Sequence, residues 1–195
     1  MAENEKQALR KHVLKVRKAL DSVFHEQADR LICARLLELP ELRSSQCVGA
    51  YVSDGTEPDL TVFFEKFMLS QGKLFLPRSS LHSGGLEYGM AQIDTLDNGL
   101  VDGAYGIPEP GKHCREANDD ELNKMLWLVP GVAFDDQGRR LGRGKGFYDR
   151  LLNSGSGIKI GIFYECQKTD TVPVETHDQL LDVIITEERT YRTKQ

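Results

Sequence analysis

A run of glycines and cations at residues 139–149 is the segment of this chain best suited to binding phosphate. Glycines stand at the alternate positions 142, 144 and 146, where they remove side chains that would keep a ligand away from the backbone. Successive N–H groups of such a loop can form a nest for an anion, and the positive end of a following helix adds to it. Arg140, Arg143 and Lys145 supply full charges that suit phosphate oxygens. The segment therefore predicts a phosphate-binding loop, and the alternative is a solvated basic loop on the surface.

The spacing of this loop differs from two familiar phosphate-binding signatures. Lys145 is followed by Gly146 and not by Ser or Thr, so the loop is not a G-x-x-x-x-G-K-[ST] motif. Its G-x-G-x-G pattern also differs from the G-x-G-x-x-G of dinucleotide-binding folds. The loop follows the apolar run 125–129, which predicts a buried strand. In open α/β sheets ligands bind beyond the carboxyl ends of the strands, which is where this loop would lie.

Helices and strands alternate along the chain. Helical spacing of apolar residues predicts a first helix around residues 9–20, with Lys6, Arg10 and Arg17 on a neighbouring polar face. Further helices are expected at 26–39, 59–69 and 147–153, and strands at 47–52, 73–76, 125–129, 159–163 and 183–186. Pro77 is expected to end the second strand, and residues 78–112 read as a long functional loop with weak strand character at 86–91. This order predicts an α/β fold: a single domain over residues 1–195, with a mostly parallel central sheet and helices on both faces.

Composition narrows the class of protein. The chain has 195 residues, and its 30 acidic against 25 basic residues give a net charge of −5, which argues mildly against a nucleic-acid-binding protein. The four cysteines are not at metal-ligand spacing and are expected to be free thiols. No apolar run approaches the ~20 residues that a membrane span needs, so we expect a soluble, cytoplasmic protein.

Five blocks of sequence resemble one family. LGRGKGFYD at 141–149, preceded by PGVAFD at 130–135, is similar to the signature of 5-formyltetrahydrofolate cyclo-ligases, also called 5,10-methenyltetrahydrofolate synthetases. The pair Lys6 and Arg10, the segment 53–57, the Y-G-I-P-E-P loop at 105–110 and the C-terminal block 172–182 resemble the other family motifs in the same order. The matches span nearly the whole chain, and residues 78–100 align least.

The resemblance implies an ATP-dependent enzyme with Mg²⁺ as cofactor and ATP as co-substrate. The reaction would cyclise 5-formyltetrahydrofolate to 5,10-methenyltetrahydrofolate and release ADP and phosphate. The formyl oxygen would attack the γ-phosphate, and the folate N10 would then close the ring and expel phosphate. Phosphoryl transfer depends mostly on positioning and charge stabilisation, so a loop of glycines and cations suits it without a side-chain nucleophile.

Site residues follow from the matched motifs. The ATP-binding residues implied are Lys6, Arg10, Arg140, Leu141, Gly142, Arg143, Gly144, Lys145, Gly146, Phe147 and Tyr148. The folate-binding residues implied are Arg10, Val52, Glu57, Tyr105, Arg143, Gly144, Lys145, Gly146 and Phe147. Arg143 and Lys145 would contact the γ-phosphate and so carry the catalysis. From the residues alone, Lys6 and Arg10 could also form a solvated helix face.

Asp149 and Asp182 are the metal ligands that the resemblance implies. The two carboxylates would meet in space, since Mg²⁺ typically takes one or two carboxylates with phosphate oxygens and water. Without the resemblance, Asp149 is an acid near a helix N-terminus and Asp182 ends a turn. His177, Asp178 and Gln167 also match the family and are left unassigned.

The expected partners are small molecules, a reduced folate and ATP, acting on a monomer with no nucleic acid and no membrane. Three other classes stay open: a non-catalytic nucleotide- or folate-binding protein, another ATP-dependent ligase or kinase, and a nucleic-acid-binding module. The acidic net charge disfavours the last of these.

Overall fold

The computed structural model describes residues 2–82, 85–103, 106–144, 146–152, 155–173, 175 and 178–193. The helices are α1 (Ala2–Lys18), α2 (Ser22–Glu38), α3 (Pro40–Arg43), α4 (Thr61–Leu69), α5 (Leu96–Gly99), α6 (Asp119–Lys124), α7 (Phe147–Leu152) and the 3-10 helix η2 (Glu165–Gln167). The strands are β1 (Cys47–Gly49), β2 (Lys73–His82), β3 (Gly85–Ile93), β4 (Leu100–Val101), β5 (Glu109–Pro110), β6 (Leu126–Pro130), β7 (Ala133–Phe134), β8 (Arg140–Leu141), β9 (Lys159–Ile162), β10 (Val183–Ile185) and β11 (Thr190–Arg192). Within these ranges no helix has both the length and the apolarity to cross a bilayer.

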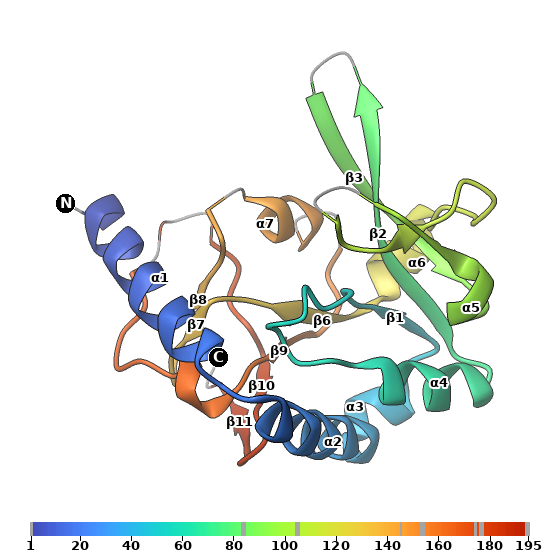
Figure 1. Ribbon diagram of the computed structural model, residues 1–195. Coiled ribbons are helices and arrows are strands. Elements are labelled where there is room, and N and C mark those ends of the chain that lie inside the picture. Colours follow the sequence, from blue (N-terminus) through green and yellow to red (C-terminus); the bar gives the residue numbers. More distant parts are fainter. Residues whose placement is uncertain are drawn as a thin grey trace.

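Seven strands form the central sheet, in the order β11-β10-β9-β6-β1-β2-β3. The five inner strands are parallel to their neighbours, and β3 and β11 run antiparallel at the two edges. α2, α3 and α4 lie together along one face, while α6 and α7 lie toward the other (Figure 1). The predicted α/β class with a mostly parallel sheet is confirmed.

Alternating side chains build a core on each face of the sheet. In β6, Leu126 and Leu128 join the core that α2 and α4 cover, whereas Trp127 and Val129 join the core on the α7 side. A strand buried on both faces needs apolar residues at every position, and all of β6 is buried. This is why the sequence of β6 reads as one continuous apolar run.

The predicted boundary between the first two helices is confirmed. Asp21 has extended backbone angles, and its carboxylate accepts a hydrogen bond from the Phe24 N–H, so it caps α2. The cap starts α2 at Ser22, four residues before the predicted position.

Pro77 does not end the second strand, contrary to the prediction. Pairing of β2 with β1 stops at Phe75, so the missing N–H of Pro77 interrupts no ladder on that side. On its other side β2 continues against β3 as a long hairpin, in which Pro77 pairs with Met90. The hairpin projects beyond the rest of the molecule (Figure 1). Much of the segment expected as a loop, 78–112, is therefore regular structure, although the strand signal at 86–91 is confirmed in β3.

Candidate functional site

A pocket of about 560 Å³ lies beyond the carboxyl ends of β1 and β6. These two strands are neighbours at the centre of the sheet, so the segments that follow them, Tyr51-Val52 and Pro130-Gly131, meet at one place. The pocket is lined by Lys6, Arg10, Tyr51, Val52, Glu57, Pro77, Tyr88, Ile107, Pro108, Glu109, Pro130, Gly131, Arg140, Leu141, Gly142, Arg143, Gly144, Gly146, Phe147, Tyr148, Asp149, Arg150 and Asp178. The motifs thus converge on one cavity.

The glycine-rich loop forms one wall of this pocket. It leaves β8 at Leu141, whose buried side chain anchors the loop, and enters α7 at Phe147. Gly144 and Gly146 have φ angles of +89° and +61°, which residues with a Cβ rarely adopt. The loop can take this course because of its glycines, as the sequence predicted. Lys145 and Tyr105 lie outside the described residues, so their assigned roles stay predictions.

Arg140 and Asp149 form an ion pair at the two ends of the loop. The Nη2 of Arg140 donates to Oδ1 of Asp149 at 2.5 Å, and the Arg140 side chain is only 4% exposed. Burial lowers the pKa of Arg140, although the charge of Asp149 opposes that shift. The pair holds both side chains at the pocket in defined positions.

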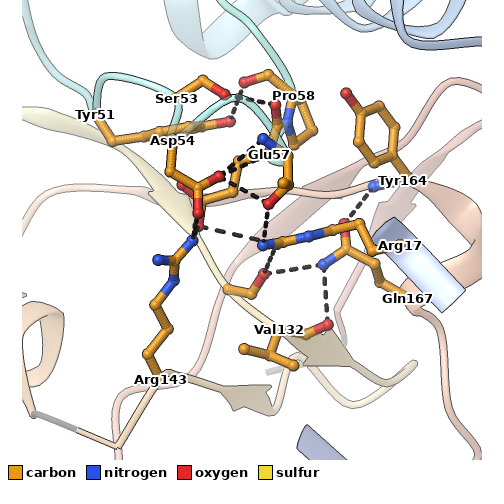
Figure 2. A network of polar contacts seen from close by, with 12 residues as sticks. Arg17, Tyr51, Ser53, Asp54, Glu57, Pro58, Val132, Arg143, Tyr164 and Gln167 are labelled. Carbon is orange, nitrogen blue, oxygen red and sulfur yellow. Dashed lines mark hydrogen bonds and ion pairs between the residues drawn. The ribbon is translucent and has the colours of Figure 1, made fainter. Parts of the chain in front are cut away.

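Arg143 contacts two carboxylates of the loop that follows β1. Its Nη2 donates to Oδ2 of Asp54 and to Oε1 of Glu57, the latter at 2.9 Å (Figure 2). Burial raises the pKa of Glu57, and the charge of Arg143 only partly offsets this. The pKa of Asp54 is lowered to about 2, because hydrogen bonds from Arg143 and Thr56 outweigh its burial. The site therefore holds both a readily ionised and a reluctantly ionised carboxyl group.

One face of α1 supplies cations to the pocket. Lys6, Arg10, Val13 and Arg17 follow one another at helical spacing, and the side chains of Lys6 and Arg17 are buried. The Nε of Arg10 donates to the Gly142 carbonyl at 3.0 Å, which joins the helix to the glycine-rich loop. The alternative of a solvated polar face is wrong, because this stripe packs inward against the site.

Lys6 joins the C-terminal block to α1. Its Nζ lies 3.0 Å from Glu175 and 3.6 Å from Asp178. Burial lowers the pKa of Lys6, but the hydrogen bond that Lys6 donates to Glu175 and the two carboxylate charges outweigh burial and raise the pKa overall. Asp178, to which the sequence assigns no role, therefore belongs to the pocket, whereas His177 lies outside the described residues.

Glu109 and Tyr88 are pocket residues to which the sequence assigns no role. Glu109 is buried and accepts hydrogen bonds from the N–H and hydroxyl of Ser79, at 2.7 and 2.6 Å. The ring of Tyr88 contacts that of Phe147 edge-on, with centroids 4.3 Å apart. Both depend on the β2–β3 hairpin, which the sequence did not predict. The sequence did contain a signal that Arg17 is buried. It stands four residues after Val13 and therefore on the same helix face as this apolar residue.

Asp182 lies at the amino ends of the strands and Asp149 at the pocket beyond their carboxyl ends, so the structure does not bring together the two carboxylates that are predicted to share a metal ion. Oδ2 of Asp182 accepts from the Lys159 N–H at 2.8 Å, at the amino end of β9. The pocket lies at the carboxyl end, where Ile162 pairs with Pro130, and three strand residues separate the two ends by about 10 Å. The Asp182 carboxylate therefore links the start of β10 to the start of β9. Among the described residues, no three His, Cys, Asp or Glu side chains form a group that could hold a metal.

Comparison with known proteins identifies the family of this chain. The sequence model of the 5-formyltetrahydrofolate cyclo-ligase family matches residues 2–187. The chain belongs to this family. A probable 5-formyltetrahydrofolate cyclo-ligase of Schizosaccharomyces pombe is 30% identical over 198 residues, covering 91% of this chain and 96% of that protein. The 5-formyltetrahydrofolate cyclo-ligase of Haemophilus influenzae is 29% identical, covering 95% of this chain and all of the relative.

Solved structures agree with the 5-formyltetrahydrofolate cyclo-ligase assignment. The 5,10-methenyltetrahydrofolate synthetase of Aquifex aeolicus superposes with a TM-score of 0.83 at 33% identity, covering 97% of this chain and 93% of that one. That of Mycoplasma pneumoniae gives 0.71 at 27% identity, covering 93% and 98%. The family predicted from the sequence motifs is confirmed, and the fold is that of these synthetases.

Proposed function

We propose that this protein catalyses the ATP-dependent cyclisation of 5-formyltetrahydrofolate to 5,10-methenyltetrahydrofolate. The observation that carries the proposal is a pocket in which the glycine-rich loop and the cationic face of α1 meet a wall of apolar and aromatic residues. A transfer from ATP to a folate needs both substrates in one cavity with reacting atoms in contact. Members of the same family carry this activity in their names.

The cations and the apolar residues line different parts of the pocket, which suggests how the two substrates lie. Arg140, Arg143 and Arg10 line the pocket around the glycine-rich loop and, with Lys6, would hold the phosphates. Lys145 is proposed to do the same from its position in the sequence of this loop. Val52, Pro77 and Tyr88 offer apolar surface to the folate, and the carboxylate of Glu57 suits the N–H donors of its pterin ring. We assign the remaining loop residues to the boundary between the ATP site and the folate site: Leu141, Gly142, Gly144, Gly146, Phe147 and Tyr148.

The proposed chemistry consists of two displacements. The formyl oxygen attacks the γ-phosphorus and ADP leaves, which turns a poor leaving group into a phosphate ester. N10 then attacks the formyl carbon, loses its proton and expels inorganic phosphate, which leaves the 5,10-methenyl cation. Arg143 and Lys145 would stabilise the charge that develops on the transferred group, and this stabilisation is the main contribution of the protein.

Asp149 is the residue that would hold Mg²⁺. A single carboxylate at the mouth of the glycine-rich loop fits an ion that takes most of its remaining ligands from phosphate and water. When bound, the ion would neutralise charge on the ATP phosphates. Arg140 already occupies Oδ1 of Asp149, so the ion and this guanidinium would share one carboxylate.

The decisive assay mixes the protein with 5-formyltetrahydrofolate and Mg-ATP and follows the methenyl chromophore together with ADP. We expect one ADP per methenyl product. Lys145→Ala should raise the KM for ATP by tenfold or more, from the loss of about 1.4 kcal/mol or more of phosphate binding. Lys124→Ala is the matched control, because this exposed lysine pairs with Asp120 on α6 and does not line the pocket. ATP binding without any chromophore would refute the proposal in favour of a binding protein or another ATP-dependent ligase.

We also propose that the protein acts as a monomer in the cytoplasm, on small molecules and not on nucleic acid or a membrane. Its net charge of −5 supports this.

A further inference from the structure

Arg17 is a buried arginine that lies behind the pocket and not in it. Its side chain is 1% exposed, and its guanidinium reaches three groups from two different loops. Nη2 donates to Oγ1 of Thr56 at 2.7 Å, and Nη1 donates to the Gly131 carbonyl at 3.3 Å and lies 3.9 Å from Oε1 of Glu57. Its Nε has no hydrogen-bond partner among the described residues. Burying a guanidinium with one donor unsatisfied is costly, so this position needs an explanation.

Glu57 lies between two arginines that approach it from different directions (Figure 2). Arg143 is 45% exposed and stands on the glycine-rich loop, whereas Arg17 is enclosed on α1. Glu57 itself is only 7% exposed. The carboxylate therefore has one counter-ion that can move and one that cannot.

The two proposed roles of Arg143 compete with each other. One Nη2 serves both Asp54 and Glu57, and the same guanidinium is proposed to contact the γ-phosphate. When it turns to the phosphate, Asp54 keeps hydrogen bonds from Thr56 and from the Glu57 N–H. Glu57 would then be a buried carboxylate without its closest cation, a state that favours protonation or displacement.

We infer that Arg17 is a positioning residue for the folate: it stays beside Glu57 when Arg143 turns to ATP and keeps that carboxylate in place as an acceptor for the pterin. The inference rests on the proposed function, because that function brings phosphate to Arg143. The Arg17 guanidinium also donates to Thr56, whose hydroxyl donates to Asp54, and so supports the turn that carries Glu57.

Gln167 contacts the same Gly131 carbonyl as Arg17. Its amide donates to the Gly131 and Val132 carbonyls, both at 2.9 Å, while its carbonyl accepts from the Tyr164 N–H at 2.9 Å. Arg17 and Gln167 thus share the Gly131 carbonyl at the end of β6, which fixes the floor of the pocket relative to α1. This accounts for Gln167, which is fully buried and had no role from the sequence.

The test compares Arg17→Gln and Arg17→Lys with Arg35→Gln as the matched control. Arg35 donates to the Glu187 and Glu188 carbonyls and does not line the pocket. For each variant, steady-state assays with 5-formyltetrahydrofolate and Mg-ATP give the folate KM, the ATP KM and the pH profile of kcat/KM for the folate. Folate affinity is also measured with and without a non-hydrolysable ATP analogue.

In Arg17→Gln we expect the folate KM to rise about tenfold, the effect of losing about 1.4 kcal/mol, with the ATP KM within about twofold of wild type. Loss of a cation beside Glu57 favours the neutral form, so the acid limb of the pH profile should move to higher pH. Arg143 and Asp54 are the other charged groups that face Glu57 and act on this limb. Tyr51 and Tyr148 also face Glu57, but they are neutral over this range because burial raises their pKa values. Arg17→Lys should restore the acid limb but only part of the folate KM, since a lysine cannot reach all three partners. The folate defect should be larger with the ATP analogue bound.

Equal losses for folate and ATP with an unmoved acid limb, or no loss in folded Arg17 variants, would overturn the inference. If Arg17→Gln does not fold, Arg17→Lys provides the test: its folate KM should rise while its ATP KM stays close to that of wild type. A wild-type protein that forms no methenyl product overturns the proposed function instead, so the two failures are distinguishable.

Discussion

Asp149 and Asp182 offer the sharpest test of how the structure changes the sequence-based assignment. Both are metal ligands in the sequence-based prediction, yet only Asp149 lines the pocket, where it pairs with Arg140 at 2.5 Å. Removing one partner of a buried ion pair costs about 3–5 kcal/mol. The Asp149 side chain is 26% exposed, and an asparagine would still accept a neutral hydrogen bond worth about 1 kcal/mol. Asp149→Asn should therefore destabilise the protein by about 2 kcal/mol, or roughly 4–8 °C in Tm for a chain of this size.

The second effect of Asp149→Asn is on metal dependence. Loss of a charged ligand worth about 1.4 kcal/mol should raise the half-saturating Mg²⁺ concentration roughly tenfold at fixed ATP. The assay is a Mg²⁺ titration of methenyl formation, with the KM for ATP measured at saturating Mg²⁺ to separate any displacement of Arg140.

Asp182→Asn is the matched control. Its carboxylate accepts a backbone hydrogen bond at the amino end of β9, and an amide oxygen keeps about half the strength of that bond. We expect a loss of about 1 kcal/mol, or roughly 2–4 °C, with no change in Mg²⁺ dependence. A raised Mg²⁺ requirement in Asp182→Asn, or an unchanged one in Asp149→Asn, would refute the reasoning.

Two further predictions concern stability away from the pocket. The pKa of Glu121 is lowered to about 2, chiefly by the hydrogen bond from Arg115, against 4.5 for a free glutamate. A lowered folded-state pKa adds stability that is full above the unfolded value and is lost as pH falls through the folded one. The Tm advantage of wild type over Glu121→Gln should thus be constant above about pH 5 and shrink from about pH 4.5 to about pH 2; a constant difference across that range in thermal melts would contradict it. Tyr164→Phe removes the hydroxyl that contacts Asp29 at 2.8 Å and His25 at 2.7 Å, and should cost about 2 kcal/mol, seen as a Tm lower by roughly 4–8 °C. An unchanged Tm would mean that water replaces the hydroxyl at no cost.

The strands that the sequence predicted well are those with side chains buried on both faces. β6 and β10 appear as short apolar runs because every position in them is buried, and the predicted boundaries differ from the observed ones by at most one residue. The hairpin of β2 and β3 is longer than its sequence predicts because Pro77 stands within it. Whether a proline ends a strand depends on which side pairs, and that is known only once the neighbours are placed.

The glycine-rich loop could be predicted from sequence because its backbone requirements and its cations are local to one segment. Gly144 and Gly146 are needed for backbone angles within the loop, and Arg140 and Arg143 lie on the same segment. The family motifs then linked this loop with the cations of α1 and with the segment that carries Glu57.

Tertiary structure decided what depends on distances between segments far apart in the chain. It separated Asp182 from Asp149 by the length of a strand and brought Asp178 to Lys6. It also turned Arg17 inward, where Glu57 stands 40 residues further along the sequence. The sequence by itself determined which residues are candidates to bind phosphate, because that selection rests on residue types and their spacing. Which carboxylate meets which cation was left to the fold, because electrostatic interactions depend on separation and burial and not on the order of residues.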